Sequence, residues 1–370
     1  MILFLLFISA CFLAYSNGAN DNFKGVATLF GSGTTNYKNA INWATITTFS
    51  GSVAAIFLAN ELVKNFSGKG LVPDGLIAKP IFAISIVLGA ALTVFIATKI
   101  GMPISTTHSL VGALFGAGVM AVGTAFNFEK LGNTFLMPLI VSPLIAAIVS
   151  YIIYIIFRHL RKKSGITKSS CICISKKQNT SQVANTNLVL EMTSAIEITT
   201  CKNGCIETYN GKILGISSQQ ILDKLHYLSA GIVSFARGLN DTPKIIGLLL
   251  VINTIDIKWS MIIIAFVMAI GGLVNAKKVG ITISKKITPM NSGQGFTANL
   301  VTGLLVTTAS IHGMPVSTTH VSVGSIFGIG TVIKKADYEM VGKILLSWLL
   351  TLPIAAIISA LLFKILQMII

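Results

Sequence analysis

Residues 101–108 read GMPISTTH and residues 313–320 read GMPVSTTH, each within a strongly apolar part of the chain. In both copies Gly-Met-Pro ends an apolar run, because proline cannot continue the helical hydrogen-bond ladder and the residue before it avoids helical angles. The hydroxyl side chains then stand where a new apolar run begins, and helices favour such residues as N-caps. The two copies therefore predict two helices that begin inside an apolar region.

The composition indicates an all-α polytopic membrane protein. Of 370 residues, 53% are hydrophobic and 11% are charged, whereas soluble globular chains carry about 25% charged residues. Residues 80–98, 135–157, 259–275 and 344–363 form runs long enough to cross a hydrocarbon layer, which takes about 20 apolar residues. Only helices satisfy their own backbone groups in lipid over such lengths. The net charge of +16 is attributed to cytoplasmic loops and not to nucleic-acid binding.

A second pair of related motifs lies upstream of the first pair. Residues 18–25 read GANDNFKG and residues 238–245 read GLNDTPKI. Each precedes its Ser-Thr-Thr-His motif by a similar distance, so both the order and the spacing of the motifs recur. Two motifs that recur in register indicate an internal duplication.

The duplication divides the chain into three parts. We predict membrane repeats at 1–157 and 222–370, joined by a linker at 158–221 whose basic beginning places it in the cytoplasm. Each repeat shows about five apolar segments, and an odd number gives the two repeats opposite orientations, as in transporters with inverted repeats. Residues 1–16 are interpreted as the first membrane helix and not as a signal peptide, because no Lys or Arg precedes their apolar stretch.

The duplicated hydroxyl triplets predict a site for a tetrahedral oxyanion. A helix that begins within the membrane presents free N–H groups and the positive end of its dipole. Two broken helices or re-entrant segments from opposed repeats would bring two such ends together near the midplane. A lone triplet is more typical of helix packing or of hydroxyls bonded to a preceding carbonyl, but the duplication favours the anion site. The candidate ligands are Ser105, Thr106, Thr107, Ser317, Thr318 and Thr319, with Asn20 and Asn240 as further donors or acceptors.

Carboxylates and histidines beside these motifs are candidates for binding a coupling ion. Carboxylates inside a membrane are costly and usually functional, so Asp21 and Asp241 are expected to bind a cation or a proton. A simple capping role at a water-exposed helix end is the alternative. Because a glycine precedes each Asn-Asp pair, a helix break is expected there. His108 and His320 can carry a proton near neutral pH, or they can cap the broken helices or hydrogen-bond a neighbour.

Together these motifs resemble the inorganic phosphate transporter (PiT) family, whose two halves carry Gly-Ala-Asn-Asp and Pro-x-Ser-Thr-Thr-His signatures. The match covers both repeats and leaves out only the middle linker. The resemblance implies phosphate uptake driven by sodium or protons, two inverted repeats, and a homodimer. It also implies phosphate contacts from both hydroxyl triplets and both asparagines, with cations near Asp21 and Asp241.

The chain departs from the family pattern at the same point in each repeat. Many members read Asn-Asp-x-x-Asn, where the second Asn helps to hold sodium, but here Lys24 and Lys244 take that place. An ammonium group beside the carboxylate can replace a bound cation, which favours proton coupling. Alternatively each lysine only extends to the cytoplasmic face as an anchor, and Arg237 can play either part.

Four cysteines fall in the linker: Cys171, Cys173, Cys201 and Cys205. The reducing cytoplasm argues against stable disulfides. Four thiolates can hold a structural zinc ion, although these spacings are not a common zinc pattern. Free thiols in a small β module are the alternative.

The sequence contains no nucleotide-binding loop, catalytic triad or covalent-nucleophile motif, so we predict a transporter and not an enzyme. The expected function is secondary active transport of inorganic phosphate across the plasma membrane as a proton symport. Sodium-coupled phosphate symport is one alternative, and a permease for sulfate or another tetrahedral oxyanion is another. A channel or a nutrient sensor is the rival from a different class.

Overall fold

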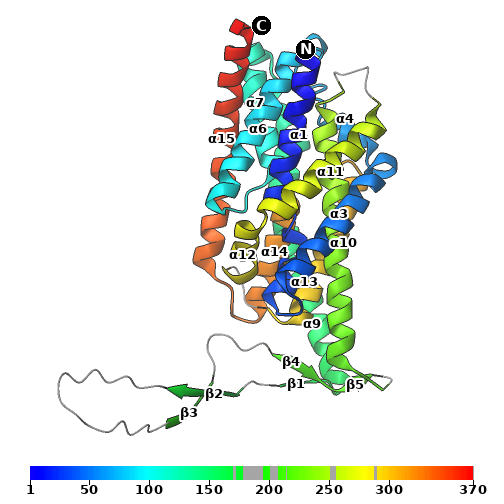
Figure 1. Ribbon diagram of the computed structural model, residues 1–370, viewed down its shortest axis with the longest axis vertical. Coiled ribbons are helices and arrows are strands. Elements are labelled where there is room, and N and C mark those ends of the chain that lie inside the picture. The colour runs from blue at the N-terminus through cyan, green and yellow to red at the C-terminus, as the bar shows by residue number, and fades with distance from the viewer. Residues whose placement is uncertain are drawn as a thin grey trace, which may run out of the picture.

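The computed structural model describes residues 1–169, 172–177, 195–200, 207–213, 215–250, 256–286 and 290–369. Over this part of the chain, a long bundle of helices carries a small group of strands at one end (Figure 1). Seven helical stretches of the described part are long and apolar enough to cross a membrane, as expected for a multi-pass membrane protein. They are Ile2–Gly31, Tyr37–Leu58, Pro80–Ile100, Thr106–Ala125, Phe128–Lys163, Ile257–Asn275 and Tyr338–Ile369.

The N-terminal half is helical from its start, and local signals set several of its boundaries. Pro80 occupies the first turn of one long helix, where its missing N–H is not needed. That helix ends at Gly101, whose φ of 76° suits a residue without a Cβ atom. The elements are α1 (Ile2–Asp21), η1 (Lys24–Val26), α2 (Ala27–Gly31), α3 (Tyr37–Leu58), α4 (Asn60–Asn65), α5 (Asp74–Ile77), α6 (Pro80–Ile100), α7 (Thr106–Val122), α8 (Phe128–Lys130) and α9 (Met137–Lys163).

The C-terminal half repeats this order of long helices. A capping box formed by Asn291 and Gln294 starts one of them, and Gly313, with a φ of 71°, follows its end as Gly101 does in the first half. The elements are α10 (Ser218–Gly247), α11 (Ile257–Asn275), α12 (Lys277–Lys286), α13 (Ser292–Ile311), α14 (Thr318–Val332) and α15 (Tyr338–Ile369).

The described part of the linker contains short antiparallel strand pairs. Lys168 lies opposite Tyr209 in the pair formed by the first strand after α9. Helices α9 and α10 extend into the predicted linker from either side. The basic residues at the end of α9 are good helix formers, which lets that helix continue to Lys163. The pairs are β1 (Thr167–Ser169) with β4 (Thr208–Asn210), β2 (Ile172–Lys177) with β3 (Ala195–Thr200), and β5 (Lys212–Ile213) with β6 (Ile216–Ser217).

The long helices pair across the two halves in a reciprocal way. Helix α1 packs against α11 while α10 packs against α3, and α7 packs against α15 while α14 packs against α9. The first two crossings need glycine, because a Cβ atom on Gly18 would lie 1.9 Å from the Met268 carbonyl oxygen and one on Gly238 would lie 2.1 Å from that of Thr48. In Figure 1, α1 begins at the end of the bundle far from the strands and α10 begins beside them.

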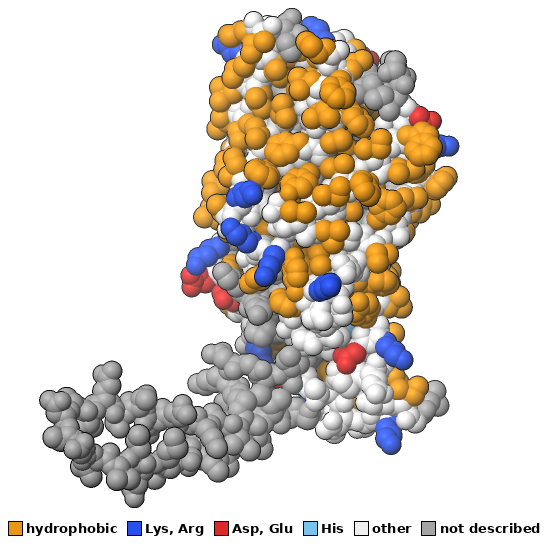
Figure 2. All heavy atoms as spheres, in the orientation of Figure 1, with side chains coloured by type: hydrophobic (Ala, Val, Ile, Leu, Met, Phe, Trp, Pro, Cys, Tyr) orange, Lys and Arg blue, Asp and Glu red, His pale blue; other side chains and the backbone are white. Residues whose placement is uncertain are grey.

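The surface of the bundle fits a lipid environment. Figure 2 shows hydrophobic side chains over most of the bundle on this face, with Lys and Arg mainly in its lower half and at its ends. Long apolar side chains such as Phe57, Ile148, Leu349 and Ile357 are exposed. Such an apolar surface is expected where hydrocarbon, and not water, surrounds the protein.

Candidate functional site

The two hydroxyl triplets begin two helices that meet inside the bundle. Ser105 is the N-cap of α7 and accepts a hydrogen bond from His108 N at 3.1 Å, and Ser317 caps α14 by accepting from His320 N at 3.3 Å. These caps confirm the helix starts that the sequence predicts. The hydroxyl residues are buried, none being more than 4% exposed: Ser105, Thr106, Thr107, Ser317, Thr318 and Thr319.

The start of each helix is hydrogen-bonded to the loop before the other one. Thr107 donates to the carbonyl oxygen of Val316 at 3.3 Å, and Thr319 donates to that of Ile104 at 3.2 Å. Ile104 and Val316 occupy equivalent places in the two GMPxSTTH motifs. The same contact is therefore made in both directions, as in an isologous interface.

Lys24 connects the first Asn-Asp motif to this meeting point. Its Nζ lies 2.5 Å from Asp21 Oδ1 and donates to Ile104 O and to Thr319 Oγ1, each at 2.6 Å. The other carboxylate oxygen of Asp21 accepts from Thr106 Oγ1 at 3.0 Å. The lysine thus joins its own carboxylate to a hydroxyl of the opposite half.

Lys244 makes the equivalent contacts from the second half. Its Nζ donates to Thr107 Oγ1 at 2.6 Å and to Val316 O at 2.7 Å, and it lies 3.5 Å from Asp241 Oδ1. Lys24 and Lys244 are 2% and 1% exposed. The interpretation of these lysines as anchors that extend to the cytoplasmic face is therefore wrong, since both ammonium groups end inside the bundle.

Asn17 and Arg237 complete the network between the two carboxylates. Asn17 Nδ2 lies 3.2 Å from Asp21 Oδ2 and 3.1 Å from Asp241 Oδ2, and it donates to both. Arg237 donates to Asn17 Oδ1 at 2.5 Å and to Asn22 Oδ1 at 3.0 Å, and its Nε lies 3.5 Å from Asp241 Oδ2. Asn17 and Arg237 are equivalent positions of the two repeats, because each directly precedes the glycine of its Asn-Asp motif. The contact therefore joins two equivalent residues.

The charges of the site do not cancel. Lys24, Lys244 and Arg237 carry three positive charges when ionised, and Asp21 and Asp241 carry two negative ones. One positive charge remains among these five groups. Together with the two helix N-termini, this excess favours an anion between the halves.

Asn20 lies in the site with one polar atom unused. Its Nδ2 donates to Thr98 Oγ1 at 3.0 Å and to Met102 O at 3.1 Å. Its Oδ1 is buried and has no hydrogen-bond partner among the described residues. A buried acceptor of this kind is costly unless a ligand or water donates to it.

Asn240 occupies the equivalent place, but its helix differs from the expectation. Its Nδ2 donates to Thr318 Oγ1 at 3.3 Å, and its Oδ1 accepts from Ser310 Oγ at 3.2 Å. The expected helix break is found at Asp21, where α1 ends, but α10 continues through Asp241 to Gly247. The expected helix break at Asn240-Asp241 was therefore wrong. The side chains of Asn240 and Asp241 bond to other parts of the structure and do not cap a helix end.

The two motif histidines contact each other. The ring centroids of His108 and His320 are 4.4 Å apart in an edge-to-face arrangement, and His320 stacks on Trp348 at 3.7 Å. His320 Nδ1 lies 3.1 Å from the carbonyl oxygen of Leu139. Among the described residues, His108 Nδ1, His320 Nε2 and Trp348 Nε1 are buried without a hydrogen-bond partner. The pair therefore holds polar ring atoms in an apolar region just behind the hydroxyls.

The four linker cysteines fall mostly outside the described part of the chain. Cys171, Cys201 and Cys205 lie outside the described residues, and the side chain of Cys173 is not described. Within the described ranges, no group of three or more His, Cys, Asp or Glu side chains is arranged to hold a metal ion.

Sequence reasoning missed Asn17 and Trp348. Asn17 carried a usable signal, because an Asn four residues before Asp21 in an apolar helix lies on the same face as the carboxylate. Trp348 carried none, since it lies in the last long helix and reaches His320 only through tertiary packing.

Known proteins resemble this chain in sequence and in fold. Residues 4–359 match the profile of a family described as "Phosphate transporter family". A Pyrococcus abyssi protein named "Putative phosphate permease" is 28% identical over 98% of both chains. A Bacillus subtilis protein named "Probable low-affinity inorganic phosphate transporter" is 26% identical over 100% of this chain and 99% of its own. A solved structure named "The sodium-dependent phosphate transporter" has the same fold, with a TM-score of 0.78 at 21% identity over 100% of both chains.

Proposed function

The chain belongs to the phosphate transporter family, and from this premise we propose that it carries inorganic phosphate across the plasma membrane by secondary active transport, without catalysing a chemical reaction. The observation that carries the proposal is the meeting of two hydroxyl-capped helix N-termini inside the bundle, beside three cations and two carboxylates. Such a site offers backbone N–H groups, hydroxyls and a net positive charge to an anion.

The hydroxyl residues and the two asparagines are the proposed phosphate ligands. In the described state, Thr107 and Thr319 already hold the ammonium groups of the two lysines. A phosphate oxygen that enters between them meets a hydroxyl and an ammonium hydrogen at the same place. Charge-assisted hydrogen bonds of this kind are stronger than neutral ones.

Phosphate is favoured over sulfate by the unused acceptor on Asn20. Phosphate near pH 7 retains at least one P–O–H group, which can donate to Asn20 Oδ1, whereas sulfate has no proton to donate. A ligand without a donor leaves this buried oxygen unpaired, which costs about 1–3 kcal/mol. Uptake of labelled phosphate by proteoliposomes should therefore be blocked by excess phosphate and not by excess sulfate. Equal inhibition by both anions would favour a general oxyanion permease.

We propose that the transported phosphate is coupled to protons at Asp21 and Asp241. Both carboxylates have an ammonium group beside them, where a sodium ion would meet like charge. Sodium coupling is the alternative. The solved structure with the same fold is named a sodium-dependent phosphate transporter, and that description applies to that protein.

The two halves are proposed to be inverted repeats that rock against each other. The reciprocal Thr107–Val316 and Thr319–Ile104 contacts support a pseudo-two-fold relation. So does the contact of His108 with its counterpart His320, since only residues on such an axis meet their own equivalents. The opposite starting ends of α1 and α10 in Figure 1 agree with it. Counterflow of labelled phosphate in proteoliposomes tests the rocking carrier, because a channel or a sensor gives none.

The proposal also covers the location of the linker and the oligomeric state. We place the linker, residues 158–221, in the cytoplasm between the membrane repeats 1–157 and 222–370, and we propose a homodimer as the assembled form. Protease cleavage in the linker only after opening right-side-out membranes tests the first statement. Cross-linking of two full-length chains in native membranes tests the second.

A zinc ion held by the four linker cysteines remains a proposal based on the chemistry of thiolates. Metal analysis of the purified chain should then find about one zinc per chain, lost on replacing all four cysteines with serine. Purified protein without zinc would leave these residues as free thiols. Transport should survive the replacement in either case, because the linker lies outside both repeats.

A further inference from the structure

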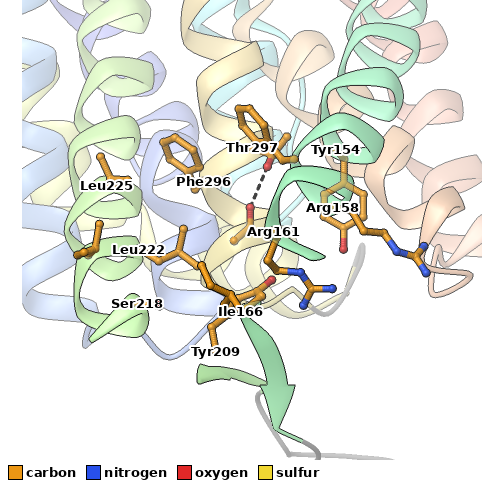
Figure 3. A pocket seen from close by; sticks show the side chains of 13 residues that line it. Tyr154, Arg158, Arg161, Ile166, Tyr209, Ser218, Leu222, Leu225, Phe296 and Thr297 are labelled. Carbon is orange, nitrogen blue, oxygen red and sulfur yellow. Dashed lines mark hydrogen bonds between the residues drawn. The ribbon is translucent and has the colours of Figure 1, made fainter. Parts of the chain in front are cut away.

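A cavity lies where α9, α10 and α13 meet the linker strands (Figure 3). Its volume is about 250 Å³. It is distinct from the anion site, because its lining residue Leu222 stands eighteen positions before Asn240 on α10, or about 27 Å at 1.5 Å per residue. Figure 3 shows Arg158 and Arg161 of α9 on one side of the cavity and Leu222 and Leu225 of α10 on the other.

The floor of the cavity is apolar and aromatic. Phe157 of α9 and Phe296 of α13 stack with ring centroids 6.0 Å apart, and Leu222 of α10 also lines the cavity. The hydroxyl of Thr297 donates to the carbonyl oxygen of Gly293 at 2.9 Å, so it is already bonded within α13. A ligand that fills this floor must present an apolar part.

The rim, in contrast, carries positive charge that the described residues do not neutralise. Neither Arg158 nor Arg161 forms an ion pair within the described ranges. The guanidinium of Arg161 lies 5.5 Å from the ring centroid of Tyr209, and its Nη1 is buried with no hydrogen-bond partner in the described part of the chain. A buried guanidinium nitrogen without an acceptor indicates a missing anion.

The nearby carboxylate of Glu207 is committed elsewhere. It lies 2.5 Å from Lys168 Nζ and 3.8 Å from Lys335 Nζ. Burial alone would raise the pKa of Glu207, but the hydrogen bond and charge of Lys168, with the charge of Lys335, hold that pKa below its ordinary value. Glu207 therefore stays ionised and paired with the lysines, and the two arginines remain available.

The apolar floor continues onto the outer surface of the bundle. Leu225, Leu228 and Ile232 are exposed and follow one another at helical spacing on one face of α10. The basic end of α9 closes the candidate span Phe128–Lys163, where cationic side chains meet lipid headgroups. The cavity thus adjoins both an exposed apolar stripe of α10 and the basic end of a candidate membrane span.

We propose that this cavity binds one anionic phospholipid, with its phosphate on Arg158 and Arg161 and the first part of an acyl chain against Phe157, Leu222 and Phe296. Basic pockets between membrane helices on the cytoplasmic side suit such headgroups. Free phosphate fits poorly, because the apolar walls leave most of its oxygens without donors.

A lipid in this place would hold the linker to the bundle. Tyr209 of β4 lines the cavity, its hydroxyl donates to Asn291 Oδ1 at 2.9 Å, and its N–H donates to Gln219 Oε1 at 2.9 Å. The occupant would therefore touch α9, α10, α13 and the linker strand at once. Helix α10 also carries Arg237 and Asp241 of the anion site, which connects lipid composition to the transporting helices.

Native mass spectrometry of the full-length protein in mild detergent tests the proposal. Phosphatidylglycerol and phosphatidylcholine with identical acyl chains are offered to the wild type and to the double variant Arg158→Gln/Arg161→Gln. The wild type should retain phosphatidylglycerol in preference to phosphatidylcholine, and the double variant should retain about tenfold less of it. The matched control is Lys162→Gln/Lys163→Gln, which removes the same charge from the same helix end outside the cavity and should bind as the wild type does.

Two further arms test whether the cavity itself holds the lipid. Leu225→Trp narrows the cavity without changing charge and should also reduce phosphatidylglycerol retention, which keeps the test independent of how the arginine variants fold. An excess of inorganic phosphate should not displace the lipid. Equal losses in the two double variants, equal retention of the two lipids, or displacement by inorganic phosphate would each overturn the proposal.

Discussion

Lys24 of the N-terminal half donates a 2.6 Å hydrogen bond to Thr319 of the C-terminal half, 295 positions away in sequence. Lys244 makes the reciprocal 2.6 Å bond to Thr107. Each lysine also pairs with the aspartate three residues before it. One ammonium group in each half therefore links an aspartate to a hydroxyl of the opposite half.

The reciprocal contacts predict equal effects for equivalent threonines. Thr107→Val and Thr319→Val keep the shape of the side chain but remove the hydroxyl that faces a lysine and the expected anion. Each should weaken apparent phosphate affinity by about tenfold to a hundredfold, corresponding to about 1–3 kcal/mol.

The concentration dependence of phosphate uptake in proteoliposomes measures this change. Thr331→Val on the same helix as Thr319 is the control, because its hydroxyl donates only to the local Gly328 carbonyl oxygen, and its affinity should stay near that of the wild type. If one of the two site variants transported with unchanged affinity, that half would not contribute to the site.

Removing one lysine should destabilise the fold because it strands a buried carboxylate. Lys24→Met removes the ammonium partner of Asp21, where the two side chains are 1% and 5% exposed, and breaking a buried ion pair costs about 3–5 kcal/mol. The same substitution in Lys64, which pairs with Glu61 at the same spacing but with side chains 67% and 62% exposed, should change stability by at most about 1 kcal/mol.

Thermal unfolding of the detergent-purified variants compares these two lysines. The double variant Lys24→Met/Asp21→Asn should recover much of the loss, because it also removes the stranded charge. Equal melting temperatures for Lys24→Met and Lys64→Met would show that Asp21 does not depend on the ammonium group.

Replacing the paired histidines should distinguish uptake driven by a pH gradient from phosphate counterflow. If His108 and His320 carry the coupling proton in place of Asp21 and Asp241, Asn at either histidine should abolish the acceleration of phosphate uptake by a pH gradient and preserve phosphate counterflow, which needs no net proton movement. Both modes measured in the same proteoliposomes decide the question. A parallel loss of both modes would indicate that the two rings, of which His320 stacks on Trp348, position the helix starts.

The local motifs were readable from the sequence because the physics that acts on them is local. Gly101 ends one helix and Ser105 caps the next, and the duplication showed that this arrangement occurs twice. The overall class followed from the lengths of the apolar runs, since only a helix satisfies its own backbone groups in lipid over a run of about 20 apolar residues.

The partners across the two halves were not readable in this way. The lysines were assigned to the carboxylates beside them, but their bonds to Thr319 and Thr107 depend on how the halves pack. The continuation of α10 through Asp241 has the same cause, because tertiary partners replace the cap that the local sequence suggested. The spacing of Asn17 from Asp21 was a local signal, but the bond of Asn17 to Asp241 depends on how the halves pack.

The central claim is that the chain moves phosphate with protons, with Lys24 and Lys244 standing where a coupling cation would bind. Uptake of labelled phosphate by proteoliposomes that hold the purified full-length chain, in sodium-free buffer with and without an inward proton gradient, tests it most directly. The proton gradient should drive accumulation, added sodium should not increase it, and Lys24→Asn/Lys244→Asn should shift the requirement towards sodium. Uptake that occurs only with sodium and ignores the proton gradient would contradict the claim.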